Sequence, residues 1–174
     1  MFQLKRGILI CSLLLLCGCS FFSKREQKVE SPPVEFLFIV HGKKGDFVRN
    51  PDNLKQGTLS IQGVNKRVIF FSDRPVRDAG SIPMQKFIDL WHTGTMNFND
   101  VPPNAGFVFF ENNDKKFSDI PVKITLPSYD EQRNTLTLQV DSLIGDFEED
   151  KAGMLEVTLF IDPWKGIDME KWRL

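Results

Sequence analysis

The sequence predicts a mainly β fold, an antiparallel β sandwich or barrel with one short amphipathic helix. From Val34 onward, short runs rich in β-branched and aromatic residues alternate with turn residues. Several runs alternate strictly between apolar and polar side chains, as Leu59 and Ile61 do among Thr and Ser neighbours, which is typical of a strand with one buried face. Only one segment shows helical spacing instead, so we expect helical structure to be a minor part of the fold.

In chain order, the expected strands are residues 35–40, 45–49, 58–62, 67–72, 106–111, 122–126, 135–140 and 155–161. Between the first two, residues 41–45 are interpreted as a basic hairpin turn, and residues 112–114 and 132–134 supply further turn chemistry. The runs 68–71 and 107–110 are apolar on both faces, which predicts central strands that are covered on two sides. Phe70 and Phe109 are accordingly the residues that we expect at the centre of the core.

The helix is expected at residues 84–93. Pro83 suits the first turn of a helix, and Gly94 can end it. The apolar side chains recur at helical spacing, at Met84, Phe87, Ile88 and Trp91. We interpret this aromatic stripe as core packing, with a ligand platform as the alternative.

The N-terminus carries an export signal. Lys5 and Arg6 precede an apolar run, residues 7–16, which is short for a membrane span, and the small residue Gly18 precedes Cys19. The order Leu16-Cys17-Gly18-Cys19 resembles a bacterial lipoprotein signal, which implies cleavage before Cys19 and lipidation of its sulfur. A lone transmembrane anchor or an ordinary secretory signal is the alternative.

This interpretation divides the chain into three parts. Residues 1–18 are the signal peptide, residues 19–33 are the lipidated N-terminus and a polar tether, and residues 34–174 are one globular domain. The residue after the lipidated cysteine is Ser20 and not aspartate. In a Gram-negative cell, the resemblance then implies a lipid-anchored protein on the periplasmic face of the outer membrane.

Composition excludes several kinds of chemistry from the domain. All three cysteines, Cys11, Cys17 and Cys19, lie in the signal or at its edge, so the domain has no disulfide, no cysteine-based metal site and no cysteine nucleophile. Without the basic Lys5 and Arg6 of the signal, 20 basic side chains remain against 23 acidic ones, a net charge of −3, which gives no case for nucleic acid. The sequence contains no recognisable metal, cofactor or nucleophile motif, and we assign no cofactor, no metal ligand and no catalytic residue.

Two polar clusters stand out. The first follows the strand at 67–72 and contains Asp73, Arg74, Arg77 and Asp78, and the arginines are a candidate fork for a carboxylate or a phosphate. Pairing of these arginines with the neighbouring aspartates is the structural alternative, and Trp91 and His92 complete the set of candidate binding residues. The second cluster, Glu148-Glu149-Asp150, is interpreted as a solvated acidic turn, with a divalent cation as the alternative.

The first cluster also carries a resemblance. The block Phe71-Ser72-Asp73-Arg74-Pro75 with Arg77 and Ala79-Gly80, followed by Pro102-Pro103-Asn104-Ala105, resembles an uncharacterised family of small exported bacterial proteins. The resemblance spans residues 36–162 and implies a shared fold and not a mechanism. The function we expect is that of a non-catalytic binding or assembly module, held at the membrane by its lipid and docked on another envelope protein. A small envelope hydrolase with its site at Asp73–Asp78 is the alternative.

Overall fold

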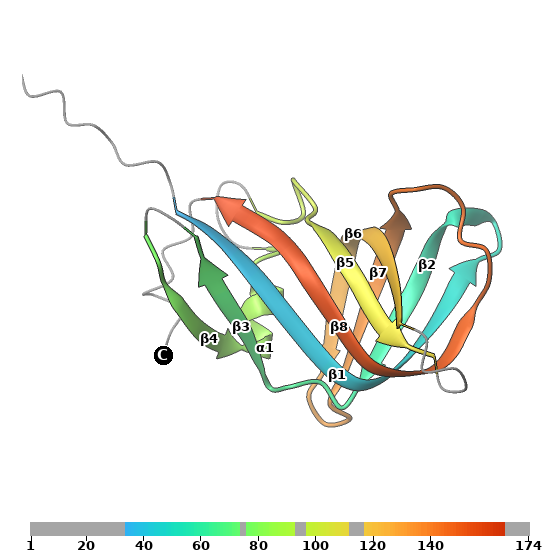
Figure 1. Ribbon diagram of the computed structural model, residues 1–174, viewed down its shortest axis with the longest axis horizontal. Coiled ribbons are helices and arrows are strands. Elements are labelled where there is room, and N and C mark those ends of the chain that lie inside the picture. Colours follow the sequence, from blue (N-terminus) through green and yellow to red (C-terminus); the bar gives the residue numbers. More distant parts are fainter. Residues whose placement is uncertain (1–33, 74–75, 93–96, 112–116, 166–174) are drawn as a thin grey trace, which may run out of the picture. The chain divides into compact units, whose positions relative to one another are not determined.

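A computed structural model describes residues 34–73, 76–92, 97–111 and 117–165, except for the side chains of residues 164 and 165. The described chain is mainly β, with one short helix (Figure 1). The elements in chain order are β1 (Glu35–Asn50), β2 (Asn53–Gln62), β3 (Arg67–Ser72), β4 (Ala79–Pro83), α1 (Met84–Asp89), β5 (Asn104–Phe110), β6 (Phe117–Asp130), β7 (Thr135–Ser142) and β8 (Lys151–Lys165). None of the helical structure in these ranges is long and apolar enough to cross a membrane.

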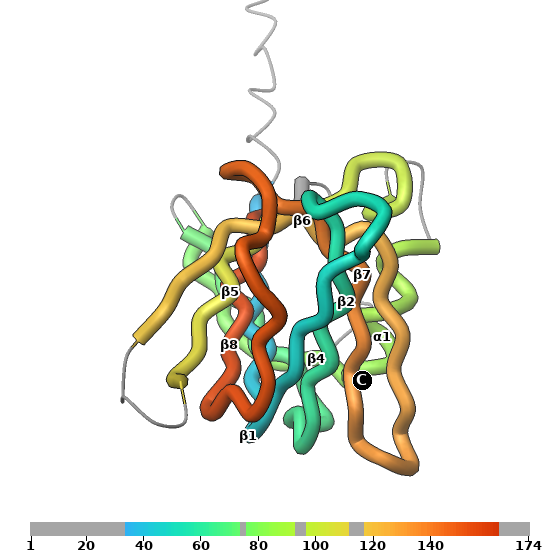
Figure 2. The backbone as a smooth tube through the Cα atoms, turned by 90° about the vertical axis from the view of Figure 1, so that its right-hand side faces the viewer, coloured from blue at the N-terminus to red at the C-terminus, as the bar shows by residue number. Residues whose placement is uncertain are grey.

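All eight strands pair antiparallel, in the order β2-β7-β6-β5-β8-β1-β3-β4. β1 joins the two ends of this order, because its first half pairs with β3 and its second half, from Lys44 to Asn50, pairs with β2. Six strands, β1, β2, β7, β6, β5 and β8, therefore form a closed ring that can be followed in Figure 2, and β3 and β4 extend the sheet beyond it. The predicted antiparallel β fold with one helix is confirmed, in its barrel-like form.

The core lies inside the ring, because the inward side chains of each strand are apolar. On β1, β2 and β7 the burial pattern follows the alternation in the sequence, so that Leu59, Ile61, Leu136 and Leu138 point inward while their neighbours face solvent. Phe70 and Phe109, the predicted core centres, are fully buried. The hairpin turn predicted at residues 132–134 is also present, between β6 and β7.

The helix α1 closes one end of the ring. Phe87 packs against Phe38 of β1 at a ring-centroid distance of 5.4 Å, and Trp91, just after the helix, packs against Phe98 at 4.6 Å. The regular helix ends at Asp89 and continues as a turn through His92, so it is shorter than the predicted segment. The aromatic stripe belongs to the core, which confirms the packing interpretation.

The predicted turn at residues 41–45 is wrong, because β1 runs through these residues as one strand. The glycines there serve close packing of strands and not chain reversal. A Cβ atom at Gly42 would lie 2.3 Å from Cγ2 of Ile61 on β2, so only glycine lets the two strands approach this closely. A Lys-Lys pair between two glycines gives no sign of such a tertiary contact.

The expectation that residues 68–71 and 107–110 are covered on two sides is also wrong. Ile69, Phe71 and Phe110 are 49%, 37% and 39% exposed, since no described element packs on the outer face of β3 or β5. β4 is not among the predicted strands, and it pairs with β3 along five residues. Its sequence, Ala-Gly-Ser-Ile-Pro, has little β propensity, and the strand exists because β3 offers it a partner.

Candidate functional site

A cavity of about 460 Å³ lies at the end of the ring opposite α1. β7 ends at Ser142, opposite Val122 of β6, whereas β6 begins five residues earlier, at Phe117, so the first part of β6 extends beyond β7. The segment 143–150 then crosses this end of the ring before β8 begins, as seen at the right of Figure 1. The cavity is lined by this segment and by the ends of the neighbouring strands, at Phe47, Phe109, Glu111, Phe117, Ser118, Asp119, Ile120, Ser142, Ile144, Asp146, Phe147, Glu148, Glu149 and Lys151. Its volume is within the range of about 300–1,000 Å³ that is usual for small-ligand sites.

Three buried aromatic rings form the floor of the cavity. Phe47 of β1 and Phe109 of β5 point into the ring of strands, and both are buried. Phe147 reaches down from the crossing segment and packs on Phe47 at a centroid distance of 4.5 Å. Its backbone N–H donates to the carbonyl oxygen of Leu54 on β2, at 2.8 Å, which fixes the segment over this end of the ring. The floor therefore offers an apolar surface in a fixed position.

The rim of the cavity is acidic. Among the described residues that line it, five carry carboxylates, Glu111, Asp119, Asp146, Glu148 and Glu149, and one, Lys151, carries an ammonium. Nζ of Lys151 lies 3.0 Å from Oε1 of Glu111 and also contacts Glu149, while the Lys151 and Glu111 side chains are only 24% and 27% exposed. These hydrogen bonds, to Glu149 first and Glu111 second, raise the pKa of Lys151 above its ordinary value. The ammonium stays charged and is held by two of the five carboxylates, so the lining remains net negative.

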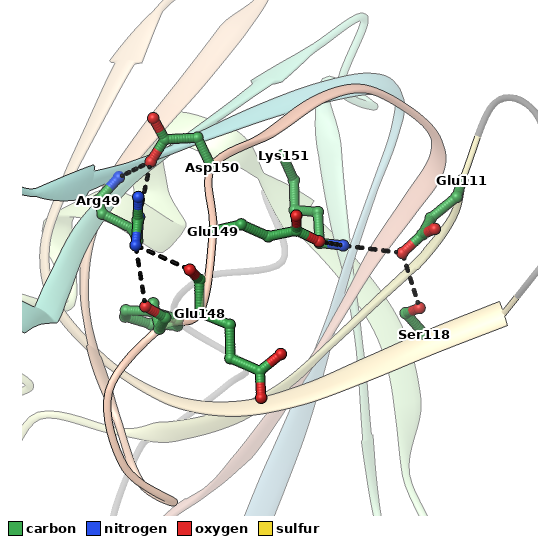
Figure 3. A network of polar contacts seen from close by, with 8 residues as sticks. Arg49, Glu111, Ser118, Glu148, Glu149, Asp150 and Lys151 are labelled. Atoms are coloured by element: carbon green, nitrogen blue, oxygen red, sulfur yellow. Dashed lines mark hydrogen bonds and ion pairs between the residues drawn. The ribbon is translucent and has the colours of Figure 1, made fainter.

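A second set of contacts ties the crossing segment to β1 (Figure 3). Both the backbone N–H and Nε of Arg49 donate to Oδ1 of Asp150, at 2.9 and 3.1 Å, and Nη1 donates to the carbonyl oxygen of Glu148 at 2.8 Å. The backbone N–H of Arg49 is the main cause that lowers the pKa of Asp150. As Figure 3 shows, the carboxylate of Glu148 points away from Arg49, so this clamp uses only its backbone. The acidic turn predicted at residues 148–150 is thus built into the cavity rim.

The sequence-predicted cluster lies elsewhere, in the loop between β3 and β4. Ser72 holds this loop, because its Oγ donates to the carbonyl oxygen of Val76 at 2.7 Å and accepts from the N–H of Asp78 at 3.0 Å. Asp73 and Arg77 are exposed and Asp78 is half-buried, while Arg74 lies outside the described residues. The sequence did not single out this serine, although Ser72 is the last residue of a predicted strand and serine is common at such turns.

Trp91 and His92 do not share one environment. Trp91 is fully buried beside Phe87 and Phe98, and its Nε1 has no hydrogen-bond partner among the described residues. The indole belongs to the core, so a ligand on the surface does not reach it. His92 is exposed on the turn after α1, and its backbone N–H donates to the carbonyl oxygen of Asp89 at 3.0 Å. Cys19, the predicted lipidation site, lies outside the described residues.

One further polar row lies on the outer face of β1 and β8. Nδ1 of His41 lies 3.0 Å from Oγ1 of Thr158, and Nε2 lies 3.2 Å from Oε2 of Glu156, whose φ of 51° is unusual for a non-glycine residue. Both ring nitrogens are engaged, so the imidazole is fixed in orientation. None of the three residues lines the cavity, and the row serves to join the two strands.

Comparison of this chain with known protein families, with curated proteins and with solved structures found no match. The geometry of the cavity is therefore the basis for any assignment of function.

Proposed function

We propose that this chain is a lipid-anchored, non-catalytic binding protein of the bacterial cell envelope, and that its ligand or partner enters the cavity at the open end of the strand ring. The cavity is the observation that carries the proposal. It combines an apolar floor with a charged rim, and the contacts of Arg49 and Phe147 fix both in advance of binding.

The chemistry of the lining favours binding over catalysis. The ammonium of Lys151 is engaged by Glu111 and Glu149, so it is not free to act on a substrate, and the described rim keeps a net negative charge. The remaining functional groups are carboxylates and the hydroxyls of Ser118 and Ser142, and Ser118 donates to Glu111 at 3.3 Å. Among the described lining residues there is no histidine and no unengaged lysine to activate either hydroxyl as a nucleophile, and the Glu111 carboxylate that Ser118 contacts is already bound by Lys151.

The direction of β1 also fits an anchored binding protein. The predicted tether ends at residue 33, just before β1 begins at Glu35, whereas Phe47, near the other end of β1, lines the cavity. Phe47 is twelve residues beyond Glu35, a path of about 40 Å along the curved strand at about 3.3 Å per residue. The binding end is thus the end of β1 farther from the point where the tether enters.

Site-specific cross-linking in cells tests this proposal. A photoreactive phenylalanine at Ile144, on the cavity rim, should give a discrete adduct, whereas the same group at Gln132, on the exposed β6–β7 hairpin, should not. Ser142→Trp, which places an indole in the cavity, should abolish the adduct from position 144. Equal adducts from positions 144 and 132, or an adduct that survives Ser142→Trp, would exclude the cavity as the binding site.

A further inference from the structure

We infer that the ligand of this cavity is an extended peptide segment with cationic side chains, which adds as a strand to the open edge of β6. The inference rests on the proposed binding function and gives its chemistry. Three features carry it: an unpaired strand edge beside the cavity, the apolar floor, and the negative rim.

The unpaired edge is the first part of β6. β5 pairs with β6 from Phe117 to Lys123, but the pairing of β6 with β7 covers only Val122 to Asp130. Within the described ranges, Phe117–Pro121 therefore has a strand neighbour on one side alone. The open side borders the cavity, since four residues of this stretch line it, Phe117, Ser118, Asp119 and Ile120.

The backbone groups on that side can be assigned from their alternation along the strand. The carbonyl oxygen of Pro121 accepts from the N–H of Leu143 at 3.1 Å, so this carbonyl, the single backbone hydrogen-bonding group of a proline, faces the β7 side. The N–H of Ile124 donates to Pro103, which lies on the β5 side, in agreement with this alternation. Asp119, two residues before Pro121, thus presents its N–H and carbonyl oxygen to the open side. An incoming strand finds one donor and one acceptor there.

The side chains around this edge suit a strand with alternating residues. Alternate side chains of an added strand would point into the ring, toward the floor of Phe47, Phe109 and Phe147. The others would point outward beside Asp119 and Phe117. The apolar floor thus favours apolar side chains at every second position of the ligand.

Charge decides what occupies the remaining positions. In the described part of the lining, five carboxylates against one ammonium attract lysine and arginine and repel acidic side chains. Phe117 is 57% exposed and packs edge-on against Phe110 at 5.6 Å, and these exposed rings offer faces for cation–π contacts. A cationic amphiphile without a peptide backbone would use the floor and the rim but not the edge, and this difference makes the inference testable.

The experiment uses the full-length lipidated protein in neutral detergent and measures fluorescence anisotropy with labelled Lys-Phe-Lys-Val-Lys-Phe. Binding should weaken about tenfold or more when alternate amides of the peptide are N-methylated, because the methyl groups remove the donors that pair with β6. Replacement of its lysines by glutamate should abolish binding. If the protein binds the N-methylated peptide and the parent peptide equally well, no strand forms, and this result would overturn the inference.

The matched protein variants are Asp119→Asn and Asp119→Pro. Both remove the charge, but only proline removes the N–H on the open side, a position where proline does not disturb the β5 ladder. Asp119→Pro should bind the peptide about tenfold more weakly than Asp119→Asn, with an unchanged circular dichroism spectrum. If proline unfolds the protein, the N-methylated peptide still tests the same hydrogen bonds.

Failure of the inference and failure of the proposed function give different results. If the peptide does not bind at all, but the adduct at position 144 forms and disappears in Ser142→Trp, the peptide inference would be overturned and the proposed binding function would remain. If Ser142→Trp binds the peptide as well as the wild-type protein does, the peptide site lies outside the cavity, and this result would also overturn the inference. Binding seen only after deletion of residues 166–174 would assign the edge to the chain's own C-terminal segment and overturn the assignment to a partner.

Discussion

Gly57 lies directly against the ring of Phe47. A Cβ atom at position 57 would lie 2.4 Å from Cε2 and Cζ of that ring and 2.9 Å from the carbonyl oxygen of Val48. The same ring packs on Phe147 from the crossing segment. Because Gly57 has no side chain, the ring of Phe47 can occupy this position in the floor of the cavity.

We expect Gly57→Ala to lower the free energy of unfolding by about 1–3 kcal/mol, because the added methyl group forces the Phe47 ring from its place. Gly106→Ala is the matched control, since a Cβ atom there meets no atom within 4 Å, and its effect should be within about 0.5 kcal/mol. Urea denaturation followed by circular dichroism measures both. Equal destabilisation by the two substitutions would contradict the close contact at Gly57.

The ion pairs of Lys151 give a second prediction. Lys151→Met should lower the free energy of unfolding by about 1–3 kcal/mol, because the three-quarters buried carboxylate of Glu111 loses the ammonium that balances its charge. Lys44→Met, on an exposed lysine, is the control and should change it by less than about 0.5 kcal/mol. A loss of the same size in both variants would show that the effect is not specific to the pair.

The pH dependence of stability follows from the same contacts. The pKa of Lys151 is raised in the folded protein above its ordinary value of 10.5. The contribution of the Lys151 ion pairs to the free energy of unfolding is therefore complete below pH 10.5, and it is lost as the pH rises through the raised pKa of the folded protein. The wild-type protein should lose stability above pH 10.5 more steeply than Lys151→Met, and urea titrations at increasing pH compare the two. Parallel curves would argue against the raised pKa.

The fold was predictable where the signal is local. Alternation at 58–62 and 135–140 identified buried faces without knowledge of the partner strands, because a two-residue period depends only on neighbouring residues. The predictions failed where distant contacts decide. Gly42 marks a close approach to Ile61 and was interpreted as part of a turn, and β4 forms only because β3 pairs with it.

The cavity was not predictable from the sequence for the same reason. Arg49 and Asp150 are 101 residues apart, and the sequence shows Asp150 only as one residue of an acidic turn. Lys151 and Glu111 likewise meet across two strands whose neighbourhood a single sequence does not reveal. The cluster that the sequence did single out, at residues 73–78, was visible because its charges are adjacent in the chain.

The predicted lipidation at Cys19 can be tested directly. Cys19→Ala should leave an uncleaved precursor and abolish fatty-acid labelling, because the thiol accepts the first lipid before cleavage in the signal that this segment resembles. Metabolic labelling of cells with a radioactive fatty acid, followed by gel electrophoresis, measures both effects. Retention of the label in Cys19→Ala would contradict the lipid anchor. Cys17→Ala is the control and should be labelled normally.

The last prediction separates the two interpretations of the loop after β3. Ser72 is buried, and its Oγ donates to the carbonyl oxygen of Val76 and accepts from the N–H of Asp78. Ser72→Ala removes both contacts and should lower the free energy of unfolding by about 1–3 kcal/mol. Arg77 is exposed, and Arg77→Lys should change the free energy of unfolding by less than about 0.5 kcal/mol. If Arg77 belongs to a recognition fork, this lysine variant should nevertheless lose affinity for a dicarboxylate such as succinate in calorimetric titrations, because lysine cannot donate in the bidentate geometry of arginine. Stability that falls in Arg77→Lys as far as in Ser72→Ala would instead assign the arginine to holding the loop.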